Sequence, residues 1–273
     1  MEIHMATPEL FEVLKQRPLG LVFDIDGTLS PIASTPDEAR LYTGVAELLA
    51  AAGEYPDTHV AIVTGRAVEN GAALVNVDGL TYIGTHGLEW SHDLPSVYPE
   101  RIEILPEALR YVEPGKRLLD LAEQKFAGMM GILVERKRIG GAVHYRLSPR
   151  PEEARQAILA LLDKPARDAN MRLSEGKCVV EIKAPVAVDK GKALRRLVQH
   201  WGLRGVVFAG DDRTDLDAVM EIARLRHEGI AALSIVVQHA DTLPVLLEHA
   251  DITVKEVEGM VELLREIVTF LRR

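Results

Sequence analysis

The sequence predicts an α/β protein: a doubly wound parallel sheet of the Rossmann-like type, with a second, α+β domain inserted into it. Short apolar segments typical of buried strands alternate with helical segments, which is the pattern of a parallel sheet covered on both faces. Four of the apolar segments end abruptly in polar, glycine-containing clusters. Between residues 64 and 190 the alternation stops for far longer than the roughly 30 residues of one strand–helix–strand unit.

The expected core strands are short runs of apolar residues at 19–23, 59–63, 80–83, 205–209, 230–237 and 252–254. Helices are expected where apolar residues recur at helical spacing, at 44–52, 190–200, 216–225 and about 259–272. Ligands of open parallel sheets bind beyond the carboxyl ends of the strands. We therefore expect the polar clusters at those ends to form one site.

The inserted domain is expected at 106–185, which leaves 1–105 and 186–273 as the core. Its pattern predicts, in order, a helix at 109–126, strands at 131–138 and 142–147, a helix at 151–162, and strands at 171–174 and 177–183. A glycine-containing turn joins each pair of strands, and the second turn is placed at Glu175-Gly176. Two antiparallel hairpins and two helices make a compact α+β unit.

Composition excludes several classes of protein. Of the 273 residues, 47% are hydrophobic and 27% are charged, as in ordinary globular chains. The formal net charge of −9 argues against nucleic acid or an anionic membrane as a partner, so an anionic ligand would need a local cluster of cations. The single cysteine, Cys178, excludes an internal disulfide and a multi-cysteine metal site. The chain shows no signal-peptide pattern and no run near the roughly 18 apolar residues of a membrane span, so we expect a cytoplasmic protein.

The strongest chemical signal is the segment Asp24-Ile25-Asp26-Gly27-Thr28-Leu29, directly after the first strand. Asp24 and Asp26 face one site, because residues i and i+2 of an extended chain point the same way. Two such carboxylates repel unless a cation lies between them or one holds a proton. The pair suits Mg²⁺, and it suits a division of roles between a nucleophile and a general acid and base. A simple turn after a strand is the alternative.

Three carboxylates follow the strand at 205–209, in the segment Gly210-Asp211-Asp212-Arg213-Thr214-Asp215. So many negative charges within a few residues are unfavourable without a counter-cation. An ordinary acidic helix start is the alternative, because carboxylates complement the helix dipole there. The nearby pair Asp24 and Asp26 favours a cation site.

Two further elements gain meaning from these clusters. Thr64-Gly65-Arg66 ends the strand at 59–63, where a hydroxyl and free backbone N–H groups can hold a phosphate, although an ordinary helix cap is the alternative. Lys190 stands at the start of a helix, which the helix dipole disfavours unless the lysine serves an anion. Taken alone, Lys190 is more typical of a solvated surface lysine.

Together these four elements resemble, in their order along the chain, the motifs of the haloacid dehalogenase (HAD) superfamily of phosphatases. The resemblance implies a HAD-type core, an inserted cap that selects the substrate, and Mg²⁺ as cofactor. It implies that Asp24 is the nucleophile that forms an aspartyl phosphate and that Asp26 is the general acid and base. The remaining implied roles are phosphoryl binding by Thr64 and Lys190, Mg²⁺ binding by Asp24, Asp211 and the Asp26 carbonyl, support of the metal waters and of Lys190 by Asp212 and Asp215, and substrate binding by Gly65 and Arg66.

In the inserted domain, Glu135 and Lys137 share one face of a strand, and Glu181 and Lys183 share one face of another. Charged acceptors and donors of this kind suit sugar hydroxyls. A solvated sheet face with charge pairs across strands is the alternative.

The residues around these pairs are similar to segments of the trehalose-6-phosphate phosphatase family. The matching segments are Val134-Glu135-Arg136-Lys137 with His144-Tyr145-Arg146, Gly84-Thr85-His86-Gly87-Leu88-Glu89, and Gly176-Lys177-Cys178-Val179-Val180-Glu181. The resemblance covers about residues 20–217. It implies that Glu135, Lys137 and Glu181 bind the distal glucose and that His86 and Glu89 belong to the substrate site at the core–cap junction. For His144 and Tyr145, hairpin packing and a role in the site both remain open.

The expected activity is Mg²⁺-dependent hydrolysis of trehalose 6-phosphate to trehalose and phosphate. The expected partners are a small sugar phosphate as substrate and, functionally, a trehalose-phosphate synthase. The alternatives are a HAD phosphatase for sucrose, glucosylglycerol or mannosylglycerate phosphate, a sugar phosphomutase, and a phosphate-responsive binding module.

Overall fold

The computed structural model describes residues 7–33 and 35–273, and the chain divides into two compact units. The core unit comprises Met1–Glu103 and Val188–Arg273, and the inserted unit comprises Ile104–Ala187. The role of the inserted unit as a substrate-selecting cap stays a prediction at this point.

The core unit is built on a sheet of strand order β12-β11-β10-β1-β2-β3-β4-β5. The parallel strands are β1 (Leu19–Phe23), β2 (Thr58–Val63), β3 (Thr81–Gly84), β10 (Gly205–Gly210), β11 (Ala231–Gln238) and β12 (Ile252–Lys255). Beyond them lie β4 (Glu89–Ser91), antiparallel to β3, and β5 (Glu103–Ile104). Every residue of β1 is buried, as expected for a strand covered on both faces. The predicted α/β class is confirmed.

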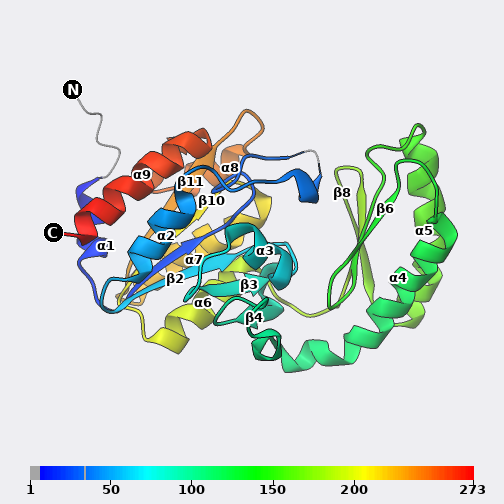
Figure 1. Cartoon of the computed structure of the whole chain (residues 1–273), viewed down its shortest axis with the longest axis horizontal. Helices are drawn as coiled ribbons and strands as arrows, with labels where there is room; N and C mark the ends of the chain where they lie inside the picture. Colours follow the sequence, from blue (N-terminus) through cyan, green and yellow to red (C-terminus); the bar gives the residue numbers. More distant parts are fainter. Residues whose placement is uncertain (1–6, 34) are drawn as a thin grey trace. The chain divides into compact units, whose positions relative to one another are not determined.

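Helices cover both faces of this sheet (Figure 1). One face packs against α1 (Pro8–Leu14), α2 (Val45–Gly53), α3 (Val68–Val75) and α9 (Glu256–Leu271). The other packs against α6 (Lys190–Trp201), α7 (Leu216–His227) and α8 (Pro244–His249). Within the described ranges, no helix is both long enough and apolar enough to span a membrane.

Helix α6 begins and ends at residues that its sequence makes suitable. The Asp189 side chain accepts a hydrogen bond from the Lys192 backbone N–H (2.8 Å), which is a standard N-cap. Gly202, with φ +58°, ends the helix in the left-handed conformation that glycine adopts readily. The cap fixes Lys190 as the first residue of the helix.

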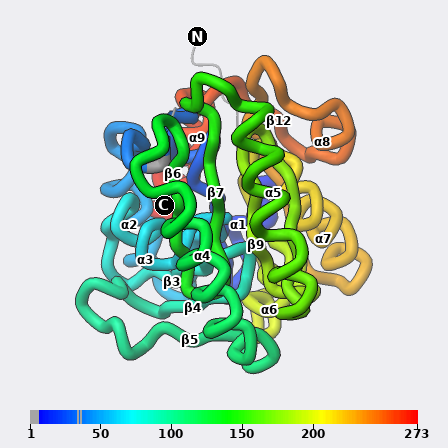
Figure 2. The backbone as a smooth tube through the Cα atoms, turned by 90° about the vertical axis from the view of Figure 1, so that its right-hand side faces the viewer, coloured from blue at the N-terminus to red at the C-terminus, as the bar shows by residue number. Residues whose placement is uncertain are grey.

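The inserted unit contains an antiparallel sheet of order β6-β7-β9-β8, with α4 and α5 side by side on one face (Figure 2). Its elements are β6 (Leu133–Arg136), β7 (Gly141–His144), β8 (Arg172–Gly176), β9 (Val179–Lys183), α4 (Val112–Phe126) and α5 (Pro151–Asp168). Val143, Val180 and Ile182 are buried beneath the helices. Short 3₁₀ turns complete the chain at Pro36–Glu38, Thr85–Gly87, Pro99–Arg101, Pro106–Tyr111 and Arg213–Asp215.

The predicted position of the second hairpin turn is wrong. Glu175 and Gly176 are the last residues of β8, and the turn is Lys177-Cys178. Cys178, not the glycine, takes the left-handed conformation, with φ +62°. A glycine is the commonest residue in such turns, but it is not required when a neighbour adopts the positive φ.

Candidate active site

Three carboxylates meet where adjacent core strands end. Asp24 follows β1 and Asp211 follows β10, and these two strands are parallel neighbours, so their carboxyl ends lie at one edge of the sheet. Asp215 joins them from the 3₁₀ turn that precedes α7. All three residues are buried, and each offers an oxygen within 4.8 Å of the others. The sequence clusters therefore form one acidic centre.

Lys190 lies inside this centre. Its Nζ is 2.9 Å from Asp24 Oδ1 and 2.6 Å from Asp215 Oδ1, and its side chain is 2% exposed. Burial alone would lower the lysine pKa, but the charges of Asp215 and Asp24 outweigh burial and raise it, so Lys190 is a cation. A lysine at the first position of a helix opposes the dipole, and the two carboxylates compensate for that.

One buried ammonium does not balance the negative charge around it. Burial raises the pKa of Asp24 well above its usual range, and Lys190 offsets this only in part. Burial, with the neighbouring carboxylates, raises the pKa of Asp211 to about 8 and that of Asp215 to about 6. Raised values of this kind mean that the centre favours either protons or a further cation.

The hydrogen bonds show which carboxylates suit a metal ion. Asp215 Oδ1 is taken by Lys190, and Asp215 Oδ2 accepts the backbone N–H groups of Asp211 and Asp212, both at 3.1 Å. Asp212 accepts from the Thr214 backbone (2.8 Å) and hydroxyl (2.7 Å), which closes the turn. Asp24 and Asp211 remain as hard oxygen donors, and one or two carboxylates are what Mg²⁺ usually takes from a protein. The donor set fits Mg²⁺.

Asp26 is held by Arg66 in a two-point ion pair. Arg66 Nε donates to Asp26 Oδ2 and Arg66 Nη2 donates to Asp26 Oδ1, both at 2.7 Å. The Thr64 hydroxyl is close by and accepts the Arg66 backbone N–H (3.2 Å). Arg66, which the sequence assigned to the substrate, thus orients the proposed acid and base in this structure.

His86 and Glu89 contact the chain around the 64–66 segment through hydrogen bonds to Thr64 and Val68. Thr85 and His86 have φ of +48° and +56°, and the His86 backbone N–H donates to the Thr64 carbonyl (3.0 Å). A Cβ at Gly65 would come within 2.7 Å of the His86 ring, so any larger residue would require the ring to shift. Glu89 is fully buried, and its Oε2 accepts the N–H of Val68 at the start of α3 (2.9 Å). In this geometry both residues support the segment from behind.

In the inserted unit, Glu135 and Glu181 lie in register on one face of the sheet. Both pair with Ala142 of the intervening strand, on the face opposite to α4 and α5. Glu135 Oε2 is 2.8 Å from His144 Nε2, and Glu181 Oε2 is 2.6 Å from Lys183 Nζ and 3.2 Å from Ser174 Oγ. Lys137 follows β6 and is half-buried. His144 therefore contacts a predicted site residue, whereas Tyr145 is buried.

The sequence reasoning missed His239. This residue directly follows β11; its Nε2 lies 2.7 Å from the Gly27 carbonyl and 3.9 Å from Asp211 Oδ2. The rule that identified Asp24 and Asp211, a polar residue just beyond a parallel strand, would have identified it. It was overlooked because no glycine or acidic cluster follows that strand directly.

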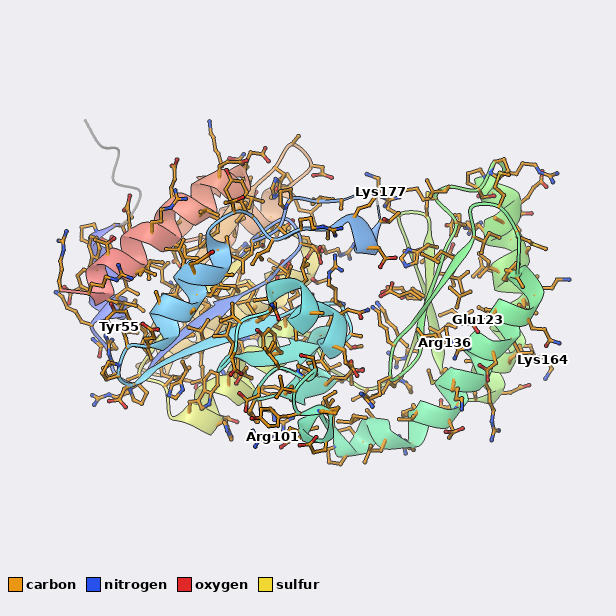
Figure 3. The ribbon with its side chains drawn as sticks, viewed as in Figure 1. Tyr55, Arg101, Glu123, Arg136, Lys164 and Lys177 are labelled. Carbon is orange, nitrogen blue, oxygen red and sulfur yellow. The ribbon has the colours of Figure 1, made fainter. Side chains whose placement is uncertain are left out.

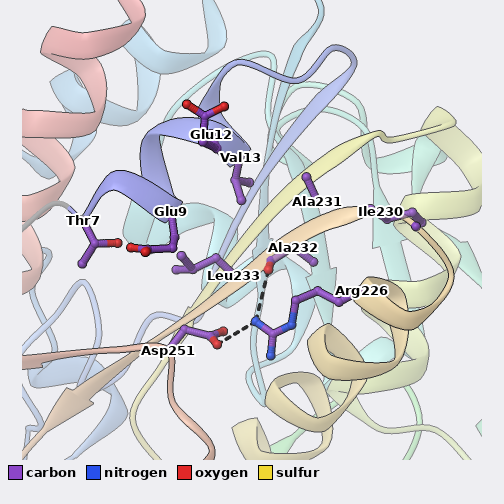
Figure 4. Close-up of a pocket in the computed structure, with 11 residues that line it drawn as sticks. Thr7, Glu9, Glu12, Val13, Arg226, Ile230, Ala231, Ala232, Leu233 and Asp251 are labelled. Carbon is purple, nitrogen blue, oxygen red and sulfur yellow. Dashed lines mark hydrogen bonds and ion pairs between the residues drawn. The ribbon is translucent and has the colours of Figure 1, made fainter.

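A separate hollow of about 690 Å³ lies in the core unit, lined by residues of α1, the end of α7 and the start of β11. On one side of it, Arg226 pairs with Asp251 (2.6 Å) and donates to the Ala232 carbonyl (3.3 Å), as Figure 4 shows. Because β11 begins here, the hollow is at the opposite edge of the sheet from the acidic centre. The residues around it include none that the sequence assigned to a site.

Comparisons with known proteins match most of the chain. A family model described as trehalose-phosphatase matches residues 22–244. Trehalose-phosphate phosphatase B of Arabidopsis thaliana is 31% identical over 241 residues, which cover 82% of this chain and 61% of that protein. A trehalose-phosphate phosphatase of Mycobacterium avium is 33% identical over 239 residues, 84% of this chain and 56% of that protein. The chain thus spans somewhat over half the length of these relatives.

Solved structures share the fold across both units. A trehalose-6-phosphate phosphatase related protein superposes with a TM-score of 0.72 at 25% identity, over 92% of this chain and 97% of that one. The C-terminal domain of a Candida albicans trehalose-6-phosphate phosphatase gives a TM-score of 0.73 at 20% identity, over 97% of both chains, which shows the fold.

Proposed function

The chain belongs to the trehalose-phosphatase family, and from that premise we propose that it is a phosphoric monoester hydrolase that converts trehalose 6-phosphate to trehalose and phosphate with Mg²⁺ as cofactor. One observation carries the chemical part of the proposal. A buried lysine bridges Asp24 and Asp215 beside Asp211, at the ends of adjacent parallel strands. A purely structural site has little reason to bury so many like charges, because each unbalanced carboxylate destabilises the fold.

In the proposed reaction, a carboxylate oxygen of Asp24 attacks phosphorus, and the bond from phosphorus to the sugar oxygen breaks. For this step Asp26 carries a proton on one carboxylate oxygen, which then no longer accepts from Arg66. Asp26 gives this proton to the leaving oxygen and then takes a proton from the water that hydrolyses the aspartyl phosphate. Thr64 and Lys190 hold the phosphoryl oxygens. Mg²⁺ bound by Asp24, the Asp26 carbonyl and Asp211 would neutralise part of the charge on the phosphoryl group.

Other residues of the site hold these catalytic and metal-binding side chains in position. Arg66 orients Asp26, and Asp215 and Asp212 hold Lys190 and the turn that carries Asp211. Behind them, Gly65, His86 and Glu89 fix the position of the Thr64 segment. Positioning of this kind supplies most of the catalysis of phosphoryl transfer.

For the sugar, we propose Glu135, Lys137 and Glu181 of the inserted unit. Glu135 and Glu181 already make hydrogen bonds on the sheet face opposite to the helices, and exchange of these bonds for bonds to glucose hydroxyls costs little. The substrate itself requires a glycosyl-transfer reaction that makes it, which is the basis for proposing a trehalose-phosphate synthase as functional partner in the cytoplasm.

The test is phosphate release, with and without Mg²⁺, from trehalose 6-phosphate, sucrose 6-phosphate, glucose 6-phosphate, mannosylglycerate phosphate and an aryl phosphate. We expect kcat/KM to be about 100-fold higher for trehalose 6-phosphate than for the others, which is about 3 kcal/mol of transition-state discrimination. Metal-dependent activity that is highest on another sugar would reject the substrate and keep the chemistry. Isomer formation without net phosphate would indicate a mutase, and inactivity on every ester would leave the binding-module alternative.

A further inference from the structure

Three contacts hold His239, two at its ring and one at its backbone N–H. Its Nε2 lies 2.7 Å from the Gly27 carbonyl, and its Nδ1 lies 2.7 Å from Glu256 Oε2. Both distances are within hydrogen-bond range, so the ring is tied at both of its nitrogens. The backbone N–H of His239 donates to the Thr242 hydroxyl (2.8 Å), and the side chain is 11% exposed. An imidazole held in this way has one orientation.

The anchor Glu256 is placed by the start of α9. It is the first residue of that helix and has φ +52°, a left-handed conformation that residues other than glycine seldom adopt. Glu256 follows β12, whereas His239 follows β11. Two neighbouring strand ends thus cooperate to hold one ring.

The ring contacts the turn that follows the proposed nucleophile, Asp24. Gly27 follows Asp26 with φ +82°; its N–H donates to the Ser30 carbonyl (2.7 Å), and its carbonyl accepts from His239. The Gly27 Cα is so close to the Asp211 carboxylate that a side chain at position 27 would collide with it. The Thr28 hydroxyl also donates to Asp211 Oδ1 (3.3 Å).

We infer that His239 is a positioning residue for the metal-binding edge, with Glu256 as its anchor. By fixing the Gly27 carbonyl and lying 3.9 Å from Asp211 Oδ2, it sets the spacing between the Asp24–Gly27 turn and the Asp211 carboxylate. This preorganises the two carboxylates for a divalent cation. The inference rests on the proposed function, because that proposal assigns Asp24 and Asp211 to the metal.

The test compares His239→Ala, His239→Gln and Glu256→Ala in the full chain. Glutamine keeps an N–H donor at a similar reach to Nε2. Mg²⁺ and Mn²⁺ dissociation constants are measured by calorimetry without substrate, and kcat and KM are measured on trehalose 6-phosphate. We expect His239→Ala to weaken metal binding about 10-fold or more, to lower kcat at subsaturating Mg²⁺, and to leave KM within about 3-fold. Glutamine should restore most of the loss, and Glu256→Ala should fall between the two.

The matched control is His249→Ala, which removes an exposed histidine of α8 whose Nδ1 lies near the Val245 carbonyl (2.9 Å). It should change neither metal binding nor kcat. Unchanged metal binding in His239→Ala would overturn the inference, and so would a glutamine variant as impaired as the alanine variant. If His239→Ala does not fold, the glutamine and Glu256 variants decide by the same criteria. A wild-type protein that binds metal but hydrolyses no ester would refute the proposed function alone.

Discussion

The charged residues proposed for the site differ in burial between the two units. In the core unit the side chains of Lys190, Asp24 and Asp215 are 2%, 6% and 0% exposed. In the inserted unit those of Glu135 and Glu181, the two acidic residues of the polar sheet face, are 18% and 25% exposed. Buried charges are costly and hold one arrangement, whereas partly exposed charges exchange their partners more readily. The difference agrees with the proposal that the core unit performs the reaction and that the inserted unit selects the substrate.

The largest expected effect is a loss of catalysis in the core unit with no change in substrate selection. Asp24→Asn removes the proposed nucleophile, and kcat should fall about 10⁴-fold or more on every substrate. The loss should be equal for trehalose 6-phosphate and an aryl phosphate, because both need the same attack on phosphorus. Phosphate-release kinetics measure this, and circular dichroism confirms the fold. Residual activity above about 1% of wild type would remove Asp24 as nucleophile.

The next effect is a loss of sugar selectivity with no change in the chemistry of the core unit. Lys137→Ala removes a charged donor from the proposed sugar site, and a hydrogen bond to a charged group contributes about 1.5–3 kcal/mol. KM for trehalose 6-phosphate should therefore rise about 10-fold to 100-fold, while KM for an aryl phosphate stays nearly constant. Equal increases for both substrates would contradict a role in sugar binding.

The core unit was the more predictable of the two from sequence, for a physical reason. A strand buried on both faces must be apolar throughout, so β1 is recognisable residue by residue, and the polar residue that ends it marks the sheet edge. Strands β4 and β5 were missed because 3 and 2 residues carry no periodicity. In the inserted sheet one face is polar, so apolar runs are broken and the β8–β9 turn was misplaced.

The contacts that complete the site could not be predicted, because they join distant parts of the chain. Arg66 and Asp26 are 40 residues apart, and His239 and Gly27 are 212 apart. Strand-end position brings such residues to one edge of the sheet. It does not say which side chain turns towards which. For Arg66 this decides between contact with the substrate and contact with Asp26.

A third prediction tests whether burial of charge costs stability in the core unit. The pKa of Asp211 is raised in the folded protein to about 8, so the folded state binds more protons than the unfolded state between about pH 4 and pH 8. Stability therefore falls as pH rises through this range, and Asp211→Asn removes that loss. Without metal, the variant should melt a few degrees above wild type at pH 8, by about 3 °C for each kcal/mol, and the gain should shrink towards pH 4.

Asp212 supplies the control of opposite sign for this experiment. Although burial acts to raise its pKa, Lys190 and the Thr214 hydrogen bonds outweigh burial and lower it, so ionised Asp212 stabilises the fold. Asp212→Asn should lower the melting temperature at pH 8. Thermal melts in a metal chelator measure both variants. If Asp211→Asn lowered the melting temperature as much as Asp212→Asn does, the raised pKa of Asp211 would not destabilise the folded protein.

The smallest expected effect comes from Arg136, the last residue of β6 and the neighbour of Lys137. Arg136 lies on the helix-covered face of the inserted sheet, where it pairs with Glu123 (2.6 Å) and Asp120 (2.5 Å) of α4. Arg136 and Glu123 are labelled in Figure 3. Its side chain is 40% exposed, so solvent screens these pairs. Arg136→Ala should shift the melting temperature by less than about 2 °C and leave both KM values unchanged. It removes the same charge as Lys137→Ala one residue away, so an equal rise in KM would show that loss of charge, and not the face it occupies, causes the Lys137 effect.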